Sequence, residues 1–253
     1  MAKQVQIKHR WSTAVLFTAD IPDDTPSGME MRVALENATR AGAYLAVSNL
    51  ADANLAGANL VGANLAGANL VGANLVGANL AGAYLAGSNL AGANLVGADL
   101  TDANLTRANL AGADLAGANL VGANLARANL VGADLARANL VGADLTDANL
   151  ARANLAGANL AGAKWRDGVA INKRPIQLHG LYWNVTILDA HMQIGCELHT
   201  LAEWSAFDDA RIVQMDGREA LRFWRAHKES LLSLARGADR SFEPVTQDAK
   251  QPA

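Results

Sequence analysis

The sequence predicts an all-β solenoid over residues 43–165, because one five-residue pattern repeats through this part of the chain without interruption. Leu recurs at every fifth position from Leu45 to Leu160, which gives 24 copies. Ala stands two residues before 22 of them, and Asn or Asp stands one residue before 22 of them. Gly stands two residues after 16 of the 24. A repeat this short and regular indicates a chain that coils on itself.

A period of five residues excludes an amphipathic helix, in which successive Leu side chains would point around the whole cylinder. It also excludes one flat strand, in which side chains alternate with period two. A short strand followed by a corner fits, because Ala and the Leu two residues later then point inward together. Gly suits the corner, but Arg and Asp occupy the same position in other repeats, so we expect that a positive φ is not obligatory there. The predicted inward residues include Leu45, Leu60, Leu80, Leu100, Leu120, Leu140 and Leu160.

Residues 1–42 are predicted to cover the open strand edge that a solenoid exposes at its first coil. Residues 5–11 and 13–18 have the composition of two short strands, which predicts a hairpin. Residues 29–40 have the pattern of a helix, and Gly42 would end it. Because this helix directly precedes the first repeat, we expect it to cap the solenoid.

Residues 166–237 predict a small α+β domain that caps the other end, after Trp165 has taken the last Leu position. Short β-rich runs lie within residues 177–194. Thr200 with Glu203 forms a capping box, which predicts the start of a short helix.

A longer helix is expected over residues 216–235, opened by Asp216 with Glu219 and stopped by Gly237. The polar residues 238–253 predict a disordered tail. The expected inward side chains of the helix are Leu221, Trp224, Leu231 and Leu234.

The motif Ala-Asn/Asp-Leu-x-x, as in residues 53–57, resembles the repeat of the pentapeptide repeat family. The resemblance implies a right-handed quadrilateral β-helix with four repeats per coil, hence about six coils and a length of ~29 Å at strand spacing. Residues 192–224 resemble segments that follow repeat arrays or close other proteins of temperate phages and prophages.

The composition excludes several classes of protein. A net charge of −3 with 18% charged residues provides neither a basic footprint for nucleic acid nor a strong acidic field. Residues 1–10 lack the apolar segment of a secretory signal, and no run approaches about 20 apolar residues. Cys196 is the single cysteine, which excludes an internal disulfide. We therefore expect a soluble, cytoplasmic protein with no membrane partner.

His191, Cys196 and His199 are the candidate metal ligands, because they could offer two nitrogens and a sulfur to zinc. A fourth ligand and paired spacing are missing, so we predict no metal site. A nucleophilic pair of Cys and His lacks an orienting motif. No phosphate loop, dinucleotide motif or nucleophile elbow occurs. The sequence thus predicts no catalytic residue, cofactor, small-molecule substrate or enzyme activity.

The best candidate for a contact surface is the stretch 53–98, which carries no charged side chain. Val71, Val76 and Val96 occupy outward positions in it, where they could meet a protein partner or a second copy. The favoured hypothesis is therefore a non-catalytic structural or interaction scaffold of phage or prophage origin.

The alternative hypothesis is a mimic of duplex DNA that occupies a type II topoisomerase (gyrase), as the resemblance to quinolone-resistance pentapeptide repeat proteins implies. The shape of the solenoid would fit, but residues 43–162 contain only seven Asp and four Arg. A DNA duplex carries one negative charge per ~1.7 Å, which is far denser. Neither hypothesis includes direct binding of nucleic acid.

Overall fold

The computed structural model describes residues 3–166, 169–178 and 180–243. The chain forms two compact units, Met1–Asn172 and Lys173–Ala253.

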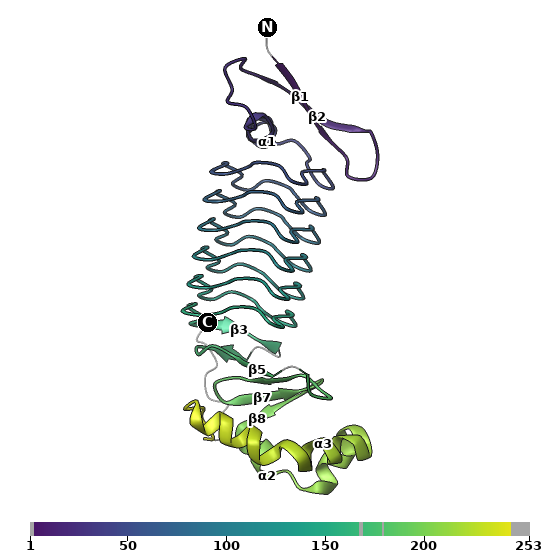
Figure 1. Cartoon of the computed structure of the whole chain (residues 1–253), viewed down its shortest axis with the longest axis vertical. Helices are drawn as coiled ribbons and strands as arrows, with labels where there is room; N and C mark the ends of the chain where they lie inside the picture. The colour runs from purple at the N-terminus through teal and green to yellow at the C-terminus, as the bar shows by residue number, and fades with distance from the viewer. Residues whose placement is uncertain (1–2, 167–168, 179, 244–253) are drawn as a thin grey trace, which may run out of the picture. The chain divides into compact units, whose positions relative to one another are not determined.

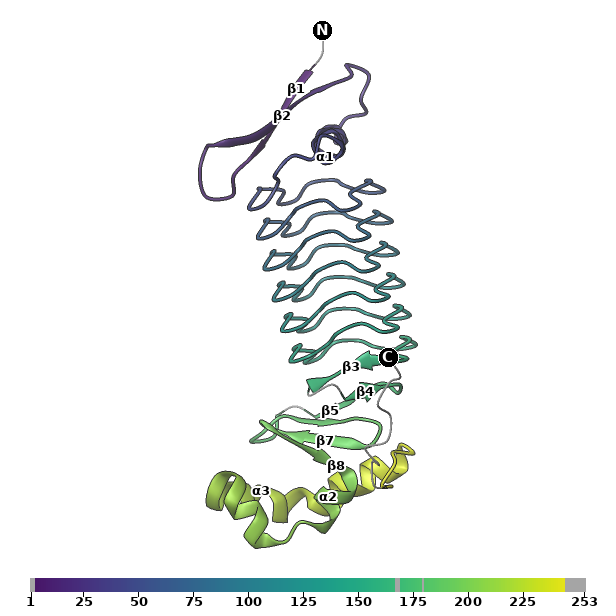
Figure 2. The same ribbon diagram turned by 180° about the vertical axis from the view of Figure 1, so that it is seen from behind.

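In the first unit, the repeats form stacked coils of 20 residues. Parallel bridges join residues 20 apart through the array, from Asn49 with Asn69 to Asp144 with Lys164. Four five-residue repeats therefore make one coil, as the family resemblance implies. Figures 1 and 2 show the coils from two sides, with each coil lying directly on the next.

The array ends in strand β3 (Ala163–Lys164), which pairs with strand β4 (Ala170–Ile171) in antiparallel fashion. This pairing holds β4 against the last coil. The first unit therefore extends to Asn172, beyond the predicted boundary after Trp165.

The interior of the coils is filled by the repeat Leu and Ala side chains. The seven Leu residues named above from Leu45 to Leu160 are at most 1% exposed, and Trp165, in the next Leu position, is 4% exposed. Burial of one Leu side chain stabilises a fold by roughly 1.5–3 kcal/mol, so the row of Leu is a main source of stability. Ser88 replaces Ala in one repeat, and its hydroxyl donates a hydrogen bond of 2.7 Å to the carbonyl oxygen of Leu85.

The corner geometry corrects one prediction from the sequence. The residue two positions after each Leu has a positive φ in every repeat, with or without glycine there. The eight non-glycine residues have φ between 55° and 60°; they are Val47, Asp52, Asp102, Arg107, Arg127, Arg137, Asp147 and Arg152. The prediction that positive φ is not obligatory was wrong, because the turn between adjacent sides requires the left-handed conformation whatever residue occupies it.

The Asn or Asp before each Leu holds the corner and links the coils. The Oδ1 of Asn74 accepts a hydrogen bond of 3.2 Å from the backbone N–H of Val76. The amide group of Asn74 also donates a hydrogen bond of 3.2 Å to Oδ1 of Asn54, one coil earlier. Both bonds recur along the array, so this position is structural in most repeats.

The N-terminal part is a hairpin followed by a helix. Strand β1 (Lys3–Lys8) pairs with strand β2 (Val15–Ile21), so the turn is wider than the sequence predicted. Helix α1 (Glu30–Arg40) buries Ala34, Leu35 and Ala38.

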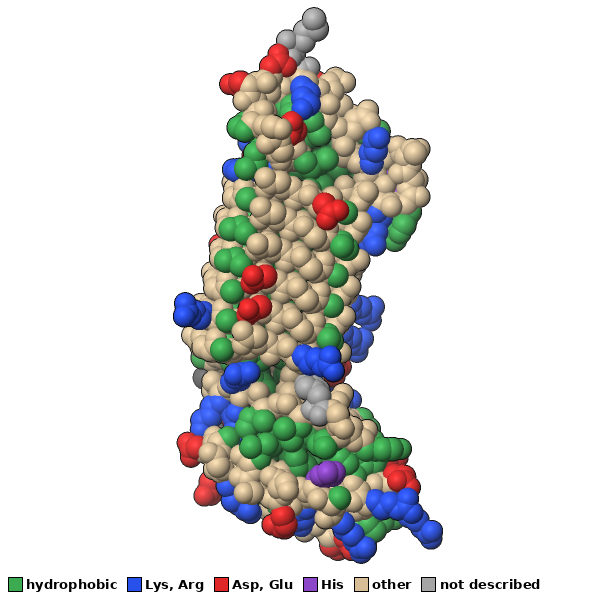
Figure 3. Space-filling model, viewed as in Figure 1, with side chains coloured by type: hydrophobic (Ala, Val, Ile, Leu, Met, Phe, Trp, Pro, Cys, Tyr) green, Lys and Arg blue, Asp and Glu red, His purple; other side chains and the backbone are tan. Residues whose placement is uncertain are grey.

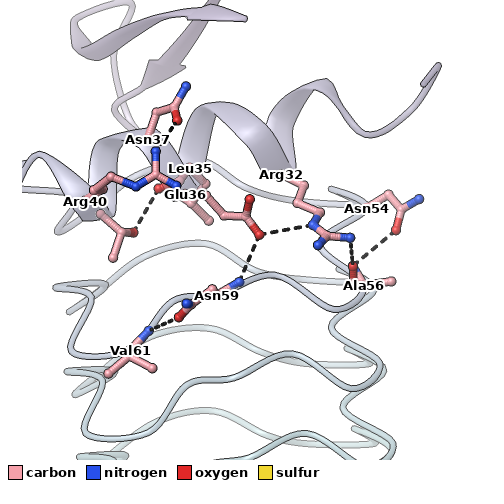
Figure 4. Close-up of polar contacts among 10 residues, drawn as sticks. Arg32, Leu35, Glu36, Asn37, Arg40, Asn54, Ala56, Asn59 and Val61 are labelled. Atoms are coloured by element: carbon pink, nitrogen blue, oxygen red, sulfur yellow. Dashed lines mark hydrogen bonds and ion pairs between the residues drawn. The ribbon is translucent and has the colours of Figure 1, made fainter. Parts of the chain in front are cut away.

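Helix α1 and the hairpin bond to the first coil, and Figure 4 shows the contacts of α1. The guanidinium of Arg32 donates a hydrogen bond of 2.8 Å to the carbonyl oxygen of Ala56, and a carboxylate oxygen of Glu36 accepts one of 3.0 Å from the N–H of Asn59. The N–H of Asn49 donates one of 2.8 Å to the carbonyl oxygen of Lys8. In later coils the equivalent backbone groups bond to the preceding coil, so these contacts occupy groups that the open edge would leave unpaired.

The second unit contains an antiparallel sheet of four strands in the order β5-β6-β7-β8. The strands are β5 (Ile176–Leu178), β6 (Val185–Ile187), β7 (His191–Ile194) and β8 (Glu197–Thr200). Helix α2 (Leu201–Ala206) follows at once and opens with the predicted capping box of Thr200 and Glu203.

Helix α3 (Asp209–Gly237) ends at the predicted stop, Gly237, but differs from the sequence prediction at its start. It begins earlier, with Asp208 as its N-cap, and it bends at Asp216 and Gly217, where the sequence predicted its start. Leu234 is 39% exposed, so the prediction that it faces inward was wrong. Leu231, Leu232 and Ala235 take the inward positions instead.

Residues 238–243 pack on the second unit, contrary to the predicted tail. Arg240 is 8% exposed and donates a hydrogen bond of 3.0 Å to the carboxylate of Asp189. Phe242 packs on the apolar core, and the guanidinium of Arg236 lies over its ring. This charged pair and aromatic contact were not visible in the polar composition of the segment. The remaining residues of the predicted tail, 244–253, lie outside the described residues.

Candidate interaction surfaces

One side of the repeat region carries the predicted contact residues. We call it the aspartate face: the column of outward side chains at positions 54, 74, 94, 114, 134 and 154, with the corners on either side of it. Figure 3 shows a side of the repeat region on which hydrophobic side chains form two rows, with two acidic side chains one above the other between them. Asn54, Asn74 and Asn94 occupy the column in the early coils, and Asp114 and Asp134 follow in the later ones.

The three predicted valines lie at the two edges of the aspartate face. Val76 and Val96 are stacked at one corner, one coil apart, where the N–H of Gly77 bonds to the carbonyl oxygen of Val96 at 2.9 Å. Val71 lies at the other corner, across the Asn column. Val71 is 36% and Val76 is 37% exposed, whereas Val96 is partly buried. The valines therefore flank a polar strip and do not form one apolar patch.

The opposite side holds exposed aromatic and basic residues. We call it the arginine face: the column at positions 44, 64, 84, 104, 124 and 144, with the corner column at 47, 67, 87, 107, 127 and 147. Its centre is ten residues from that of the aspartate face, which is half of a 20-residue coil. Tyr44 and Tyr84 stand here in the Asn position and are 69% and 55% exposed.

A shallow groove runs along the arginine face. Its lining includes Gly87, Thr106, Arg107, Arg127, Asp144 and Thr146. The guanidinium of Arg127 lies 3.9 Å from the carboxylate of Asp147, which also lies 3.6 Å from Arg166. Two features of the sequence could have revealed this side: Tyr in place of Asn, and Arg in place of the corner Gly.

The second unit does not bring its three candidate metal ligands together. In the β7–β8 pair, His191 lies opposite Thr200, and Met192 lies opposite His199, so the two histidines point to opposite sides of the hairpin. Cys196 lies in the turn and is exposed. Over the described ranges, no three His, Cys, Asp or Glu side chains are grouped as metal ligands would be.

Both histidines have local partners. Nε2 of His199 lies 3.1 Å from a carboxylate oxygen of Glu197. Burial lowers the pKa of His191, although the nearby charge of Glu203 acts in the opposite direction. These surroundings are typical of histidines that pack within a small domain.

The second unit also contains a small cavity, lined in part by Trp183, Trp204, Phe223 and Trp224. Its volume of about 40 Å³ leaves room for a few water-sized groups. Ligand pockets typically measure ~300–1,000 Å³, so this cavity is small for a metabolite.

No helix in the described part of the chain has the length and apolar composition needed to cross a membrane.

Comparisons with known proteins concern the repeat region. Solved structures similar to this chain include QnrB1, a plasmid-mediated fluoroquinolone resistance protein, at 20% identity over 47% of this chain and 68% of that one, with a TM-score of 0.31. HetL from the cyanobacterium Nostoc, a pentapeptide repeat protein involved in regulating heterocyst differentiation, is 31% identical over 50% and 80%, with a TM-score of 0.18. A pentapeptide repeat protein of the Arabidopsis thaliana thylakoid lumen is 29% identical over 48% and 67%, with a TM-score of 0.24. No curated protein matches the chain.

A family model described as pentapeptide repeats (8 copies) matches residues 48–85, 78–115, 103–140 and 128–164. The model matches the same residues whose bridges define the coils. The repeat region of this chain, residues 48–164, therefore belongs to the pentapeptide repeat family.

Proposed function

We propose that this chain is a non-catalytic interaction scaffold that contacts a protein partner through the early coils of its aspartate face. The observation that carries the proposal is a rigid stretch of coils, residues 53–98, that carries no charged side chain and has valines at the edges of the aspartate face. Each coil is fixed to its neighbours by backbone hydrogen bonds of about 2.7–3.1 Å, as at Leu75 and Asn74. A rigid surface loses little conformational entropy on binding, and uncharged groups are desolvated at low cost.

The chemistry of the repeats supports a scaffold over an enzyme. The repeat Leu and Ala residues fill the interior, and most Asn and Asp side chains are engaged in corner and ladder hydrogen bonds. A phage or prophage origin belongs to the same proposal, and it rests on the sequence of residues 192–224 alone.

The test replaces Val76 and Val96 with Lys in one variant. We expect this double variant to lose its protein contact, because two charges would have to be desolvated at the edge of the aspartate face. Binding is measured by sedimentation of the purified protein over a concentration series, and by its capture of proteins from its native cells. An intact contact in the Val76→Lys/Val96→Lys variant would contradict the proposal.

The control replaces Val213 and Leu234 with Lys. Both side chains are 39% exposed, close to the value for Val76, but they belong to helix α3 of the second unit and to neither face of the coils. We expect the control variant to bind as the unmodified protein does. Circular dichroism of all variants checks that the coils remain folded.

A further inference from the structure

We propose that the partner of the aspartate face is a second copy of this chain, which docks there with its arginine face. The inference rests on the proposed function, because it accepts the aspartate face as a contact surface, and it adds the identity and orientation of the occupant. Two sets of observations carry it: residues on the arginine face that depart from the repeat at a cost in stability, and charges that match between the two faces coil by coil.

The first departure is Tyr84, which stands where 22 of 24 repeats have Asn or Asp. In nearly all of those repeats the side-chain oxygen accepts a hydrogen bond from the backbone two residues later, as Asn64 does from Ala66 at 3.3 Å. A tyrosine ring cannot make that bond from this position. Its side chain is instead 55% exposed at the centre of the arginine face, and tyrosine is a residue type enriched in binding hot spots.

The second departure is a pair of arginines in strained corners. Arg107 and Arg127 have φ of 58° and 60°, a conformation that glycine adopts without strain and other residues adopt at a cost of about 1–2 kcal/mol each. Both side chains extend into solvent one coil apart, and only Arg127 has an acidic neighbour at 3.9 Å. Strained residues that add nothing to the local fold are expected where a surface is used for contact.

The charges on the two faces match in three consecutive coils. Residues 103–122 contain Arg107 on the arginine face and Asp114 on the aspartate face. Residues 123–142 contain Arg127 and Asp134 in the same places, with Arg137 at one corner of the aspartate face. The residues of one coil lie at nearly the same height along the solenoid, within about one strand spacing. Charges on the two faces of the same coil can therefore be compared directly.

In the third coil, residues 143–162, the signs are reversed. Asp147 stands at the corner column of the arginine face, and Arg152 stands at a corner of the aspartate face. Two copies placed side by side at the same level therefore bring Arg107 and Arg127 of one copy to the level of Asp114 and Asp134 of the other, and Asp147 to the level of Arg152. Arg137 lies at the other corner of the aspartate face from Arg152 and takes no part in these pairs.

The apolar groups lie at matching levels as well. Tyr84 of one copy reaches the level of Val76 and Val96 in the next, above the charged coils. The contact joins two different faces, so each copy keeps one face free, and the association is open-ended instead of stopping at a symmetric dimer.

The test reverses the charges on one face at a time. One variant carries Arg107→Glu and Arg127→Glu, and the other carries Asp114→Arg and Asp134→Arg. Each alone opposes like charges, and we expect its dissociation constant for self-association to rise at least about tenfold. Mixing the two variants pairs Glu with Arg and Asp with Arg at every contact, so the mixture should associate again. Arg222→Glu, at an exposed arginine of helix α3 in the second unit, lies on neither face and should have little effect.

Sedimentation velocity of each variant and of the mixture gives the result, with thermal unfolding to check the fold. Mixing that fails to restore association, or reversal that leaves it intact, overturns the pairing of these two faces. A chain that stays monomeric at every concentration but captures another protein through Val76 and Val96 overturns the second copy as occupant, while the scaffold itself stands. Two results together support both the aspartate face as a contact surface and a second copy as its occupant. They are loss of association in the Val76→Lys/Val96→Lys variant and restored association in the charge-swapped mixture.

Discussion

At the scale of single residues, the corner position is where this sequence departs from the most stable repeat, because eight repeats place a residue other than glycine at a positive φ. Asp tolerates the left-handed conformation better than most residues, so Asp52, Asp102 and Asp147 are mild exceptions. Arg has no such tolerance, and its presence at four corners needs another reason. A role on the surface supplies that reason for Arg107 and Arg127, and nothing in the structure explains Arg137.

Arg137 therefore provides a test of the strain. Arg137→Gly should stabilise the protein by about 0.5–1 kcal/mol, because relief of ~1–2 kcal/mol of strain exceeds the ~0.4–1 kcal/mol of added freedom in the unfolded chain. Gly117→Ala, one coil earlier at the same corner, should destabilise it by a similar amount. A Cβ at Gly117 would meet no atom within 4 Å, so its effect reports φ alone. Chemical denaturation measures both, and a loss of stability in Arg137→Gly would show that the corner is not strained.

At the scale of elements, the first coil depends on side chains from α1 and backbone from the hairpin. Arg32 and Glu36 bond to Ala56 and Asn59, whose equivalents in later coils bond to a preceding coil. We propose that these contacts let the N-terminal elements cap the array, since an unpaired edge invites association with other strands. The hairpin is in turn tied to α1 by Lys3, whose ammonium lies 2.7 Å from the carboxylate of Glu30.

The Lys3–Glu30 pair predicts a pH dependence of the N-terminal elements. The ammonium of Lys3, aided by the N–H groups of Glu30 and Gly28, lowers the pKa of Glu30 from 4.5 to about 2. A lowered pKa means that the stabilisation is fully present above pH 4.5 and is lost as the pH falls towards 2. Because the pair is exposed, we expect the effect to be local to the hairpin and α1.

NMR titration of the Glu30 carboxyl carbon measures this pKa directly. Lys3→Gln should shift the midpoint upwards, part of the way to 4.5, since the backbone N–H groups remain. Lys8→Gln, on the same strand, serves as the control and should leave the midpoint unchanged. Equal midpoints in the unmodified protein and Lys3→Gln would contradict the pairing.

At the scale of the whole molecule, charge decides between the two functional hypotheses. The seven Asp and four Arg of residues 43–162 are distributed over several columns, and part of the negative charge lies beside arginine, as Asp147 does. A duplex mimic needs a dense and continuous negative surface. We therefore expect the purified protein to leave DNA supercoiling by gyrase unchanged. Inhibition that disappears in the Asp114→Asn/Asp134→Asn variant would reverse this conclusion.

The sequence by itself was sufficient for the elements whose causes are local. The five-residue period excludes helix and flat strand, the capping box at Thr200 and Glu203 is contained within four residues, and the helix before Gly42 has its own stop signal. The burial of the repeat Leu side chains follows from the same period. These features depend on neighbours in the chain, which is why a pattern can predict them.

The tertiary structure decided which repeats lie above one another. Nothing within five residues fixes the number of repeats per coil; the backbone pairing of residues 20 apart does so. That pairing separates Val71 from Val76 and Val96 and gathers Tyr84, Arg107 and Arg127 on the opposite side. It also places Arg240 against Asp189, 51 residues earlier, where composition predicted a disordered tail. Faces and buried pairs are made by residues distant in the chain, so only the folded coils could define them.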